Sequence, residues 1–193
     1  MANIKYFLMT GEPGVGKTTL TKKLNSLLRS EGIKTCGFYT EEVRQNRIRE
    51  GFDVVTLDGQ RGRLARDMTV MSGLVKFRVG KYAVLVQEFE NVALPALKQP
   101  NESGPYLLII DEIGKMEFFS HSFKTVVQEI FRPDSKCMVL ATLPLRNSDK
   151  LIENIRNHAN AKLWTVTREN RNCLHGNIME EVLTSFNSNR KQI

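Results

Sequence analysis

Short apolar segments alternate along most of the chain with longer segments whose apolar residues recur at helical spacing. Brief, mostly apolar runs suit strands that are buried on both faces, and they cover residues 4–10, 35–39, 106–110, 137–141 and 163–167. Helical spacing predicts helices over residues 17–28, 88–97, 117–131, 148–158 and 172–186, with only the residues after 186 expected to be disordered. Because parallel strands need helical crossovers, this alternation predicts an α/β fold with three layers and a mostly parallel sheet.

Residues 41–86 interrupt the alternation. Their apolar runs are short and separated by turn signals, with Asp58-Gly59 after residues 52–57 and Gly80 between residues 75–79 and 82–86. Such a pattern is typical of β-hairpins or a small antiparallel sheet. We therefore predict one domain over residues 1–193 that carries a basic, β-rich insertion at about 41–86.

A glycine-rich segment joins the first predicted strand to the first predicted helix. It reads Gly11-Glu12-Pro13-Gly14-Val15-Gly16-Lys17-Thr18, followed by Thr19, and matches the G-x-x-x-x-G-K-[ST] phosphate-binding loop. Backbone N–H groups of such a loop form an anion-binding concavity at a helix N-terminus. Lys17 is expected to reach the β- and γ-phosphates and Thr18 to ligate Mg²⁺. The competing interpretation, a glycine-rich surface turn before an amphipathic helix, explains the strand–loop–helix context less well.

An acidic pair follows the apolar residues 107–110. Asp111 and Glu112 stand at the carboxyl end of a predicted central strand, where open α/β sheets bind their ligands. Asp111 is assigned to Mg²⁺, and Glu112 is a candidate to orient or deprotonate an attacking water. The alternative for Glu112 is an ordinary acidic residue near a helix N-terminus.

With a glutamate directly after the predicted metal-binding aspartate, the chain resembles the additional-strand group of P-loop proteins. In that group one strand lies between the phosphate-loop strand and the aspartate strand, and it usually ends in a polar sensor of the γ-phosphate. Thr142, which follows residues 137–141, fits that position. A strand-end threonine facing a turn before Pro144 is the alternative.

Six sequence blocks together resemble the small cancer-related nucleoside-triphosphatase family. In chain order they are residues 11–19, 37–44, 51–53, 78–82, 111–117 and 167–171, so the resemblance spans nearly the whole chain. The resemblance implies that the fold is an additional-strand P-loop core and that the protein has the size of a monomeric enzyme. It also implies a slow, Mg-dependent enzyme that hydrolyses ATP, GTP and other nucleoside triphosphates to the diphosphate and phosphate, with little base selectivity.

Other polar residues in these blocks are candidates for further catalytic roles. Lys115 is a candidate to stabilise charge on the γ-phosphate, and its alternative is a solvated lysine. Arg44 and Arg78 are candidates for an internal arginine finger, or else they pair with Glu41, Glu42 or Asp53.

The final block places Asn170 and Arg171 after the last predicted strand, at the ligand edge of the sheet. A guanidinium plane stacks on any base without discriminating its identity, so these two residues are candidates to pack on the nucleobase. The alternative is a helix N-terminus with Asn172 as its cap.

Composition narrows the function classes. The net charge is +7 and lies almost entirely in residues 1–80, which leaves two alternatives, a solvated basic surface or a nucleic-acid contact. Nucleic acid is not favoured, because no zinc finger, RRM signature or aromatic stacking series accompanies the charge.

Three cysteines and three histidines lack metal-ligand spacing, and the apolar runs are too short to span a membrane. With the first strand starting almost at Met1, no signal peptide is expected, and we predict a cytoplasmic, monomeric protein.

The leading function is therefore hydrolysis of nucleoside triphosphates with Mg²⁺ as cofactor. Two alternatives stay open: a nucleotide or nucleoside kinase that uses the same loop, and an ATP-gated module that binds nucleic acid or protein. The acidic pair after the strand favours water over a hydroxyl acceptor, whereas the basic residues at 44–81 would suit the second alternative.

Overall fold

Nine strands form one sheet within residues 4–98, 104–146 and 149–190, which are the residues that this computed structural model describes. The strands are β1 (Tyr6–Gly11), β2 (Lys34–Gln45), β3 (Ile48–Thr56), β4 (Arg61–Asp67), β5 (Arg78–Val79), β6 (Tyr82–Val84), β7 (Tyr106–Asp111), β8 (Met138–Pro144) and β9 (Ala161–Thr165). The helices are α1 (Lys17–Ser30), α2 (Val86–Ala96), α3 (His121–Ile130), α4 (Lys150–Arg156) and α5 (Leu174–Arg190), with short 3-10 turns η1 (Met68–Val70) and η2 (Glu117–Phe119).

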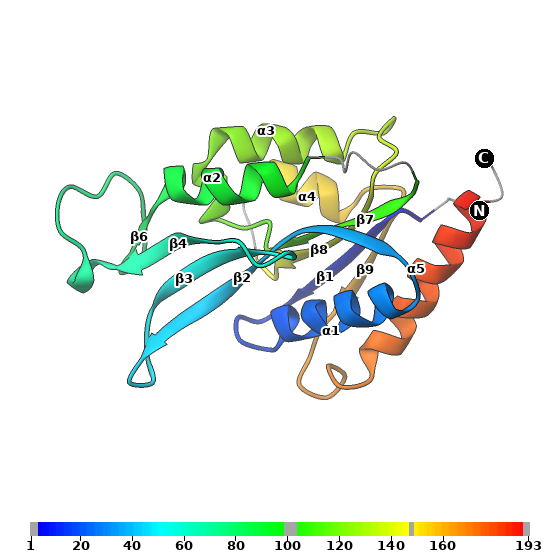
Figure 1. Cartoon of the computed structure of the whole chain (residues 1–193), viewed down its shortest axis with the longest axis horizontal. Coiled ribbons are helices and arrows are strands. Elements are labelled where there is room, and N and C mark those ends of the chain that lie inside the picture. The colour runs from blue at the N-terminus through cyan, green and yellow to red at the C-terminus, as the bar shows by residue number, and fades with distance from the viewer. Residues whose placement is uncertain (1–3, 99–103, 147–148, 191–193) are drawn as a thin grey trace.

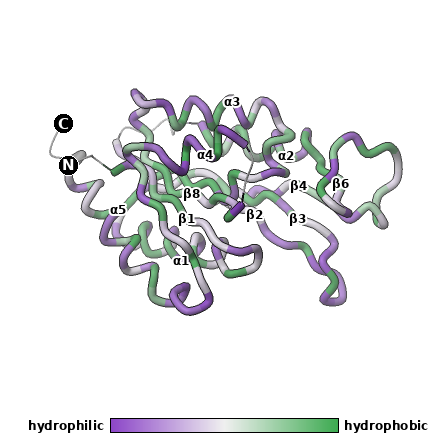
Figure 2. The backbone as a smooth tube through the Cα atoms, turned by 180° about the vertical axis from the view of Figure 1, so that it is seen from behind, coloured by the Kyte–Doolittle hydropathy of each residue, from purple (hydrophilic) through white to green (hydrophobic). Residues whose placement is uncertain are grey.

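The predicted three layers are confirmed. Helices α2, α3 and α4 cover one face of the sheet, and α1 and α5 cover the other (Figure 1). Alternate residues of the central strands supply the two cores, so that Leu8 of β1 packs under the first layer and Phe7 under the second. The hydrophobic residues of β1 and β8 and the hydrophilic β2–β3 hairpin stand out in Figure 2.

The parallel half of the sheet has the strand order β2-β7-β8-β1-β9. Strand β8 thus lies between β1, which leads into the glycine-rich loop, and β7, which ends in Asp111. This arrangement confirms the additional-strand type. Because these strands are parallel, the residues that follow β1, β7 and β8 all meet at one edge of the sheet.

The predicted antiparallel hairpins are present, and they extend the main sheet. Strand β2 is longer than predicted because its first half pairs with β7 in parallel and its second half pairs with β3 antiparallel. Strand β4 has a polar sequence, Arg-Gly-Arg-Leu-Ala-Arg-Asp, that gave no clear signal, and its pairing with β3 and β6 makes it a strand. In residues 75–79 only Arg78–Val79 is extended, and Leu74 before them is fully exposed.

Several predicted boundaries shift for local reasons. Helix α3 begins at His121, because the Ser120 hydroxyl caps it by accepting a hydrogen bond from the Phe123 N–H (2.9 Å), so residues 117–119 form a separate turn. Strand β8 continues to Pro144, which places Thr142 inside the strand and not in a turn. Helix α5 continues to Arg190, past the predicted end at 186, while Ser148 and residues 191–193 lie outside the described residues.

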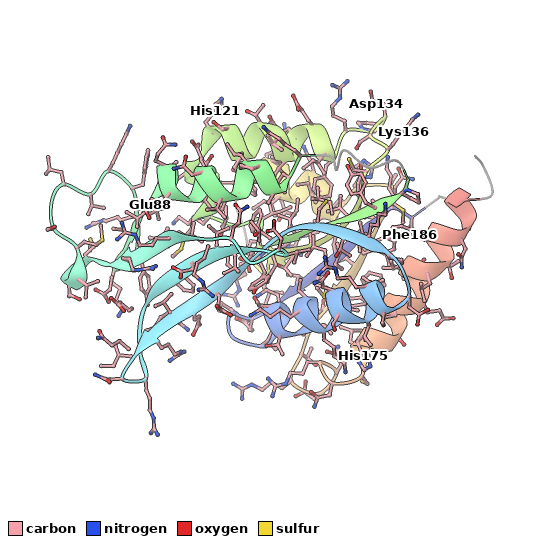
Figure 3. All side chains as sticks on the ribbon, viewed as in Figure 1. Glu88, His121, Asp134, Lys136, His175 and Phe186 are labelled. Carbon is pink, nitrogen blue, oxygen red and sulfur yellow. The ribbon has the colours of Figure 1, made fainter. Side chains whose placement is uncertain are left out.

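Ion pairs balance much of the positive charge of the antiparallel half. Five arginines between positions 44 and 66 have acidic partners in the described part of the chain: Arg44 and Arg49 with Glu42, Arg61 with Glu41 and Asp53, Arg66 with Asp53, and Arg63 with Glu88. The last pair joins β4 to α2, where Glu88 is labelled in Figure 3. Exposed pairs of this kind add little stability each, but they lower the net field of the surface. They support the solvated-surface alternative that the sequence left open.

Candidate active site

The glycine-rich loop connects β1 directly to α1 at the edge where the parallel strands end. Gly16 has φ 115°, a left-handed conformation that favours glycine, and α1 begins at the next residue, Lys17. The first N–H groups of α1 have no partners within the helix, so they point into the space that the loop encloses. This is the backbone arrangement that binds phosphate at a helix N-terminus.

Lys17 is a buried cation inside this loop. Only 8% of the residue is exposed, and its Nζ donates hydrogen bonds to the carbonyl oxygens of Gly11 (3.0 Å) and Glu12 (3.5 Å). The same Nζ lies 3.6 Å from Oε2 of Glu112. The fold therefore brings the loop lysine and the second residue of the acidic pair together, although they are far apart in the chain.

Asp111 is the most deeply buried carboxylate of the site. Its Oδ1 accepts a hydrogen bond from the Thr142 hydroxyl, whereas its Oδ2 is buried and has no hydrogen-bond partner among the described residues. Burial raises the pKa of Asp111, and the Thr142 and Thr18 hydroxyls and the Lys17 charge oppose that rise. The free Oδ2 and the neighbouring Thr18 hydroxyl are hard oxygen donors of the kind that hold a divalent cation.

Glu112 directly follows β7 and lies beside the Lys17 ammonium. Burial raises the pKa of Glu112, the Lys17 ammonium lowers it, and the Asp111 charge raises it again. About 30% of the side chain remains exposed, so the carboxyl group is still reachable from solvent. A carboxylate that is partly exposed beside a phosphate-binding lysine has the placement of a general base for water.

Glu117 completes the acidic cluster and was given no role by the sequence. It is 5% exposed, and burial, followed by the charges of Glu112 and Asp111, raises its pKa to about 8. In the sequence it resembles an acidic residue in the first turn of the predicted helix over 117–131. Its only distinguishing signal is its position six residues after Asp111, and burial at that position is decided by the fold.

The remaining predicted residues lie at different distances from this centre. Lys115 is exposed on the turn that follows Glu112, and Arg44 pairs with Glu42 on the β2–β3 hairpin. Arg78 is exposed on β5, which β6, β4, β3 and β2 separate from β7. The conformation described here thus does not bring Arg44 or Arg78 to the phosphate loop.

Asn170 and Arg171 lie on the segment between β9 and α5. The Asn170 side chain fixes this turn, because its Oδ1 accepts from the Thr167 N–H (2.8 Å) and its Nδ2 donates to the Thr165 carbonyl (2.9 Å). Arg171 donates from Nη1 to the Val15 carbonyl oxygen (3.1 Å), so it contacts the glycine-rich loop directly. Helix α5 begins at Leu174, two residues beyond the expected Asn172 cap.

Over the ranges that the structure describes, no group of three or more His, Cys, Asp and Glu side chains is arranged to hold a metal ion. The three cysteines, Cys36, Cys137 and Cys173, are free thiols. None of the helices in the described part of the chain is both long and apolar enough to cross a bilayer.

Comparison with known proteins places the whole chain among nucleoside-triphosphatases. A family model described as NTPase matches residues 6–179. The chain is 44% identical to the cancer-related nucleoside-triphosphatase of Homo sapiens, over 97% of this chain and 99% of that protein. It is 42% identical to the nucleoside-triphosphatase THEP1 of Thermotoga maritima, over 96% of this chain and 98% of that protein.

Two solved structures have the same fold. The solution structure of a human cancer-related nucleoside triphosphatase aligns with a TM-score of 0.79 at 44% identity, covering 94% of this chain and 98% of that one. The crystal structure of THEP1 from Aquifex aeolicus aligns with a TM-score of 0.78 at 37% identity, covering 91% and 97%. The fold and the family resemblance inferred from the sequence are both confirmed.

Proposed function

This chain belongs to the nucleoside-triphosphatase family, and from that premise we propose that it hydrolyses nucleoside 5′-triphosphates, ATP and GTP among them, to the diphosphate and phosphate. Water is the acceptor of the phosphoryl group, and Glu112 is the residue that activates it. Residues 11–19 hold the phosphates.

The observation that carries the proposal is the 3.6 Å approach of Lys17 Nζ to Glu112 Oε2. A lysine of this loop reaches the β- and γ-phosphates, so a carboxylate beside its ammonium lies next to the terminal phosphate. Glu112 then orients a water molecule for in-line attack and accepts its proton, while Lys17 stabilises the charge that develops on the phosphoryl oxygens.

The residues present fit a bound Mg²⁺. Asp111 offers a buried oxygen without a hydrogen-bond partner, and Thr18 offers a hydroxyl group. Asp111 and Thr18 would hold the Mg²⁺, which would supply positive charge against the negative charge of the phosphates. Thr142, which donates to the other Asp111 oxygen, orients that carboxylate and is well placed to respond to the γ-phosphate.

Lys115, Arg44 and Arg78 are proposed only as secondary contributors. Lys115 lies three residues after Glu112 on an exposed turn, and its proposed role is to stabilise charge on the terminal phosphate. Arg44 and Arg78 act as arginine fingers only if the antiparallel half of the sheet moves toward the phosphate loop. Alanine variants separate these roles, because removal of an arginine finger lowers kcat by about 10³-fold or more.

The test is phosphate release from ATP, GTP, CTP and UTP with and without Mg²⁺, comparing the wild type with Glu112→Gln. Glutamine keeps the size of the side chain but cannot accept a proton, so kcat is expected to fall by about 10²–10⁴-fold while nucleotide still binds. The matched control is Glu129→Gln, the same change on an exposed position of α3. Chelation of Mg²⁺ is expected to stop release in the wild type.

Three results would contradict the proposal. Equal release by Glu112→Gln would remove this residue as the base. Product that forms only when a hydroxyl acceptor is added, without free phosphate, would indicate a kinase. Turnover that depends on added RNA or DNA and disappears with rising salt would indicate a nucleic-acid-gated module.

A separate prediction concerns Arg171. We propose that Arg171 and Asn170 pack on the nucleobase and that Arg171 also keeps the phosphate loop ordered. Arg171→Ala removes its hydrogen bond to the Val15 carbonyl, so the loop becomes less ordered before nucleotide binds. A hydrogen bond from a charged donor contributes about 1.5 kcal/mol, which corresponds to a roughly tenfold rise in KM with a smaller change in kcat. Steady-state kinetics of Arg171→Ala and of the exposed neighbour Arg168→Ala check this, and an unchanged KM for Arg171→Ala would contradict it.

A further inference from the structure

Glu117 is a buried acid held by a tight turn close to the proposed base. The turn is closed by hydrogen bonds from the Phe118 N–H to the Gly114 carbonyl (3.1 Å) and from the Ser120 N–H to the Glu117 carbonyl (3.0 Å). The N–H groups of Gly114 and of Glu117 itself donate to the Glu117 carboxyl group. The side chain is therefore anchored to the backbone and has little freedom to move.

The carboxyl groups of Glu117 and Glu112 both lie close to Gly114. A methyl group placed on Gly114 would lie 2.9 Å from Glu112 Oε1 and 3.0 Å from Glu117 Oε2. Because both oxygens are this close to the same point, they are separated by no more than about 6 Å. Over that distance like charges influence each other strongly. The absence of a side chain at Gly114 is what allows this approach.

The charged surroundings of Glu117 are mostly negative. Asp111 of β7 and Glu112 face it, and Lys17 of α1 is engaged with Glu112. On the neighbouring helices, Glu90 of α2 accepts a hydrogen bond from Ser120, and Lys124 of α3 pairs with Asp149. The raised pKa of about 8 follows from burial beside these acids, so Glu117 holds its proton at neutral pH.

We propose that Glu117 is a positioning residue: held on its turn, it packs against the Glu112 carboxyl group across Gly114 and keeps Glu112 directed at Lys17. Because it is uncharged, it adds no second negative charge at the place where the phosphates bind. The inference rests on the proposed role of Glu112 as the base. It assigns Glu117 no contact with the nucleotide, so its effect falls on kcat and not on KM.

The test compares kcat and KM for MgATP in the wild type, Glu117→Gln, Glu117→Ala and the surface control Glu129→Gln. Glutamine keeps the shape and neutrality of the protonated acid, so kcat at pH 7 is expected to stay within about twofold of the wild type. Alanine removes the packing, and a displaced base is expected to lower kcat about tenfold with KM unchanged. Gly114→Ala separates the two carboxyl groups by another route and is expected to lower kcat similarly.

The pH dependence gives a readout that a purely structural residue would not move. Above about pH 8 Glu117 ionises, so the wild-type kcat is expected to fall where that of Glu117→Gln does not. The carboxyl group binds its proton more tightly in the folded than in the unfolded chain. The wild type therefore loses stability relative to Glu117→Gln as pH rises from about 4.5 through 8, seen as a widening difference in urea midpoint.

Two outcomes overturn the inference. If Glu117→Gln is as slow as Glu117→Ala, an ionised and not a neutral Glu117 is required. If Glu117→Ala and Gly114→Ala both keep wild-type kcat, Glu117 does not position the base. Should Glu117→Ala not fold, the pH profiles of the wild type and Glu117→Gln decide alone. Glu112→Gln distinguishes failure of the proposed function from failure of this inference. If Glu112→Gln is active, Glu112 is not the base. If Glu112→Gln is inactive while the Glu117 variants keep wild-type kcat, only this inference is refuted.

Discussion

Replacement of Lys17 by alanine is expected to abolish measurable hydrolysis. Lys17 is a buried cation that the fold holds on the carbonyl oxygens of Gly11 and Glu12, inside the loop that we propose holds the phosphates. Removing one preorganised donor to a developing anion lowers kcat by about 10²–10³-fold. The substitution also takes away the counter-charge of Glu112, 3.6 Å away, so both binding and the base are disturbed.

The measurement is phosphate release together with the equilibrium affinity for a nucleoside triphosphate. Nucleotide affinity is expected to fall by tenfold or more in Lys17→Ala. The control is Lys23→Ala, because Lys23 lies exposed on the same helix with its Nζ 3.2 Å from His175 Nδ1. Lys23→Ala should behave as the wild type. Retention of more than a tenth of wild-type kcat by a folded Lys17→Ala variant would refute the placement of phosphate in this loop.

Gly37→Ala is expected to destabilise the fold by about 3–5 kcal/mol, which is large for one methyl group. Gly37 pairs with Ile109 across β2 and β7 and has φ 113°, a conformation unfavourable for other residues. A Cβ there would lie 2.0 Å from the Ile109 carbonyl oxygen, so the two strands would have to separate. Since Asp111 ends β7 two residues later, the site would also be distorted.

Urea denaturation of the wild type, Gly37→Ala and Gly176→Ala checks this. Gly176 lies in α5 with nothing near the position of an added Cβ, so alanine there should be neutral or stabilise the helix by up to about 1 kcal/mol. A Gly37→Ala variant within 1 kcal/mol of the wild type would mean that β2 and β7 do not approach as closely as described.

The strands and helices around the phosphate loop were predictable because their signals are local. The apolar run before Gly11, the glycines and the helical spacing of leucines after Lys17 each depend only on neighbouring residues. The same holds for β7, whose apolar residues end at Asp111. By contrast, β4 has a polar sequence and becomes a strand only through its two neighbours, which no local pattern reports.

The candidate site was predictable to a similar extent. Residue type and spacing were enough to name Lys17, Thr18, Asp111 and Glu112 as candidates, because phosphate and metal binding need those groups in that order. They did not report that Arg171, a candidate for the nucleobase, also contacts the Val15 carbonyl of the glycine-rich loop, because the two residues are far apart in the chain. Arg44 pairs with Glu42 two residues away, and which partner an exposed arginine selects depends on strand register.

The sequence by itself thus determined the alternation of strands and helices, the phosphate-binding loop and the acidic pair, since each is encoded by consecutive or evenly spaced residues. Only the tertiary structure decided which distant residues meet. It placed β8 between β1 and β7, set Glu112 beside Lys17, and buried Glu117 with its carboxyl group close to Gly114. Burial and charge proximity are properties of the packed chain, and they decide which carboxyl group is ionised and which holds a proton.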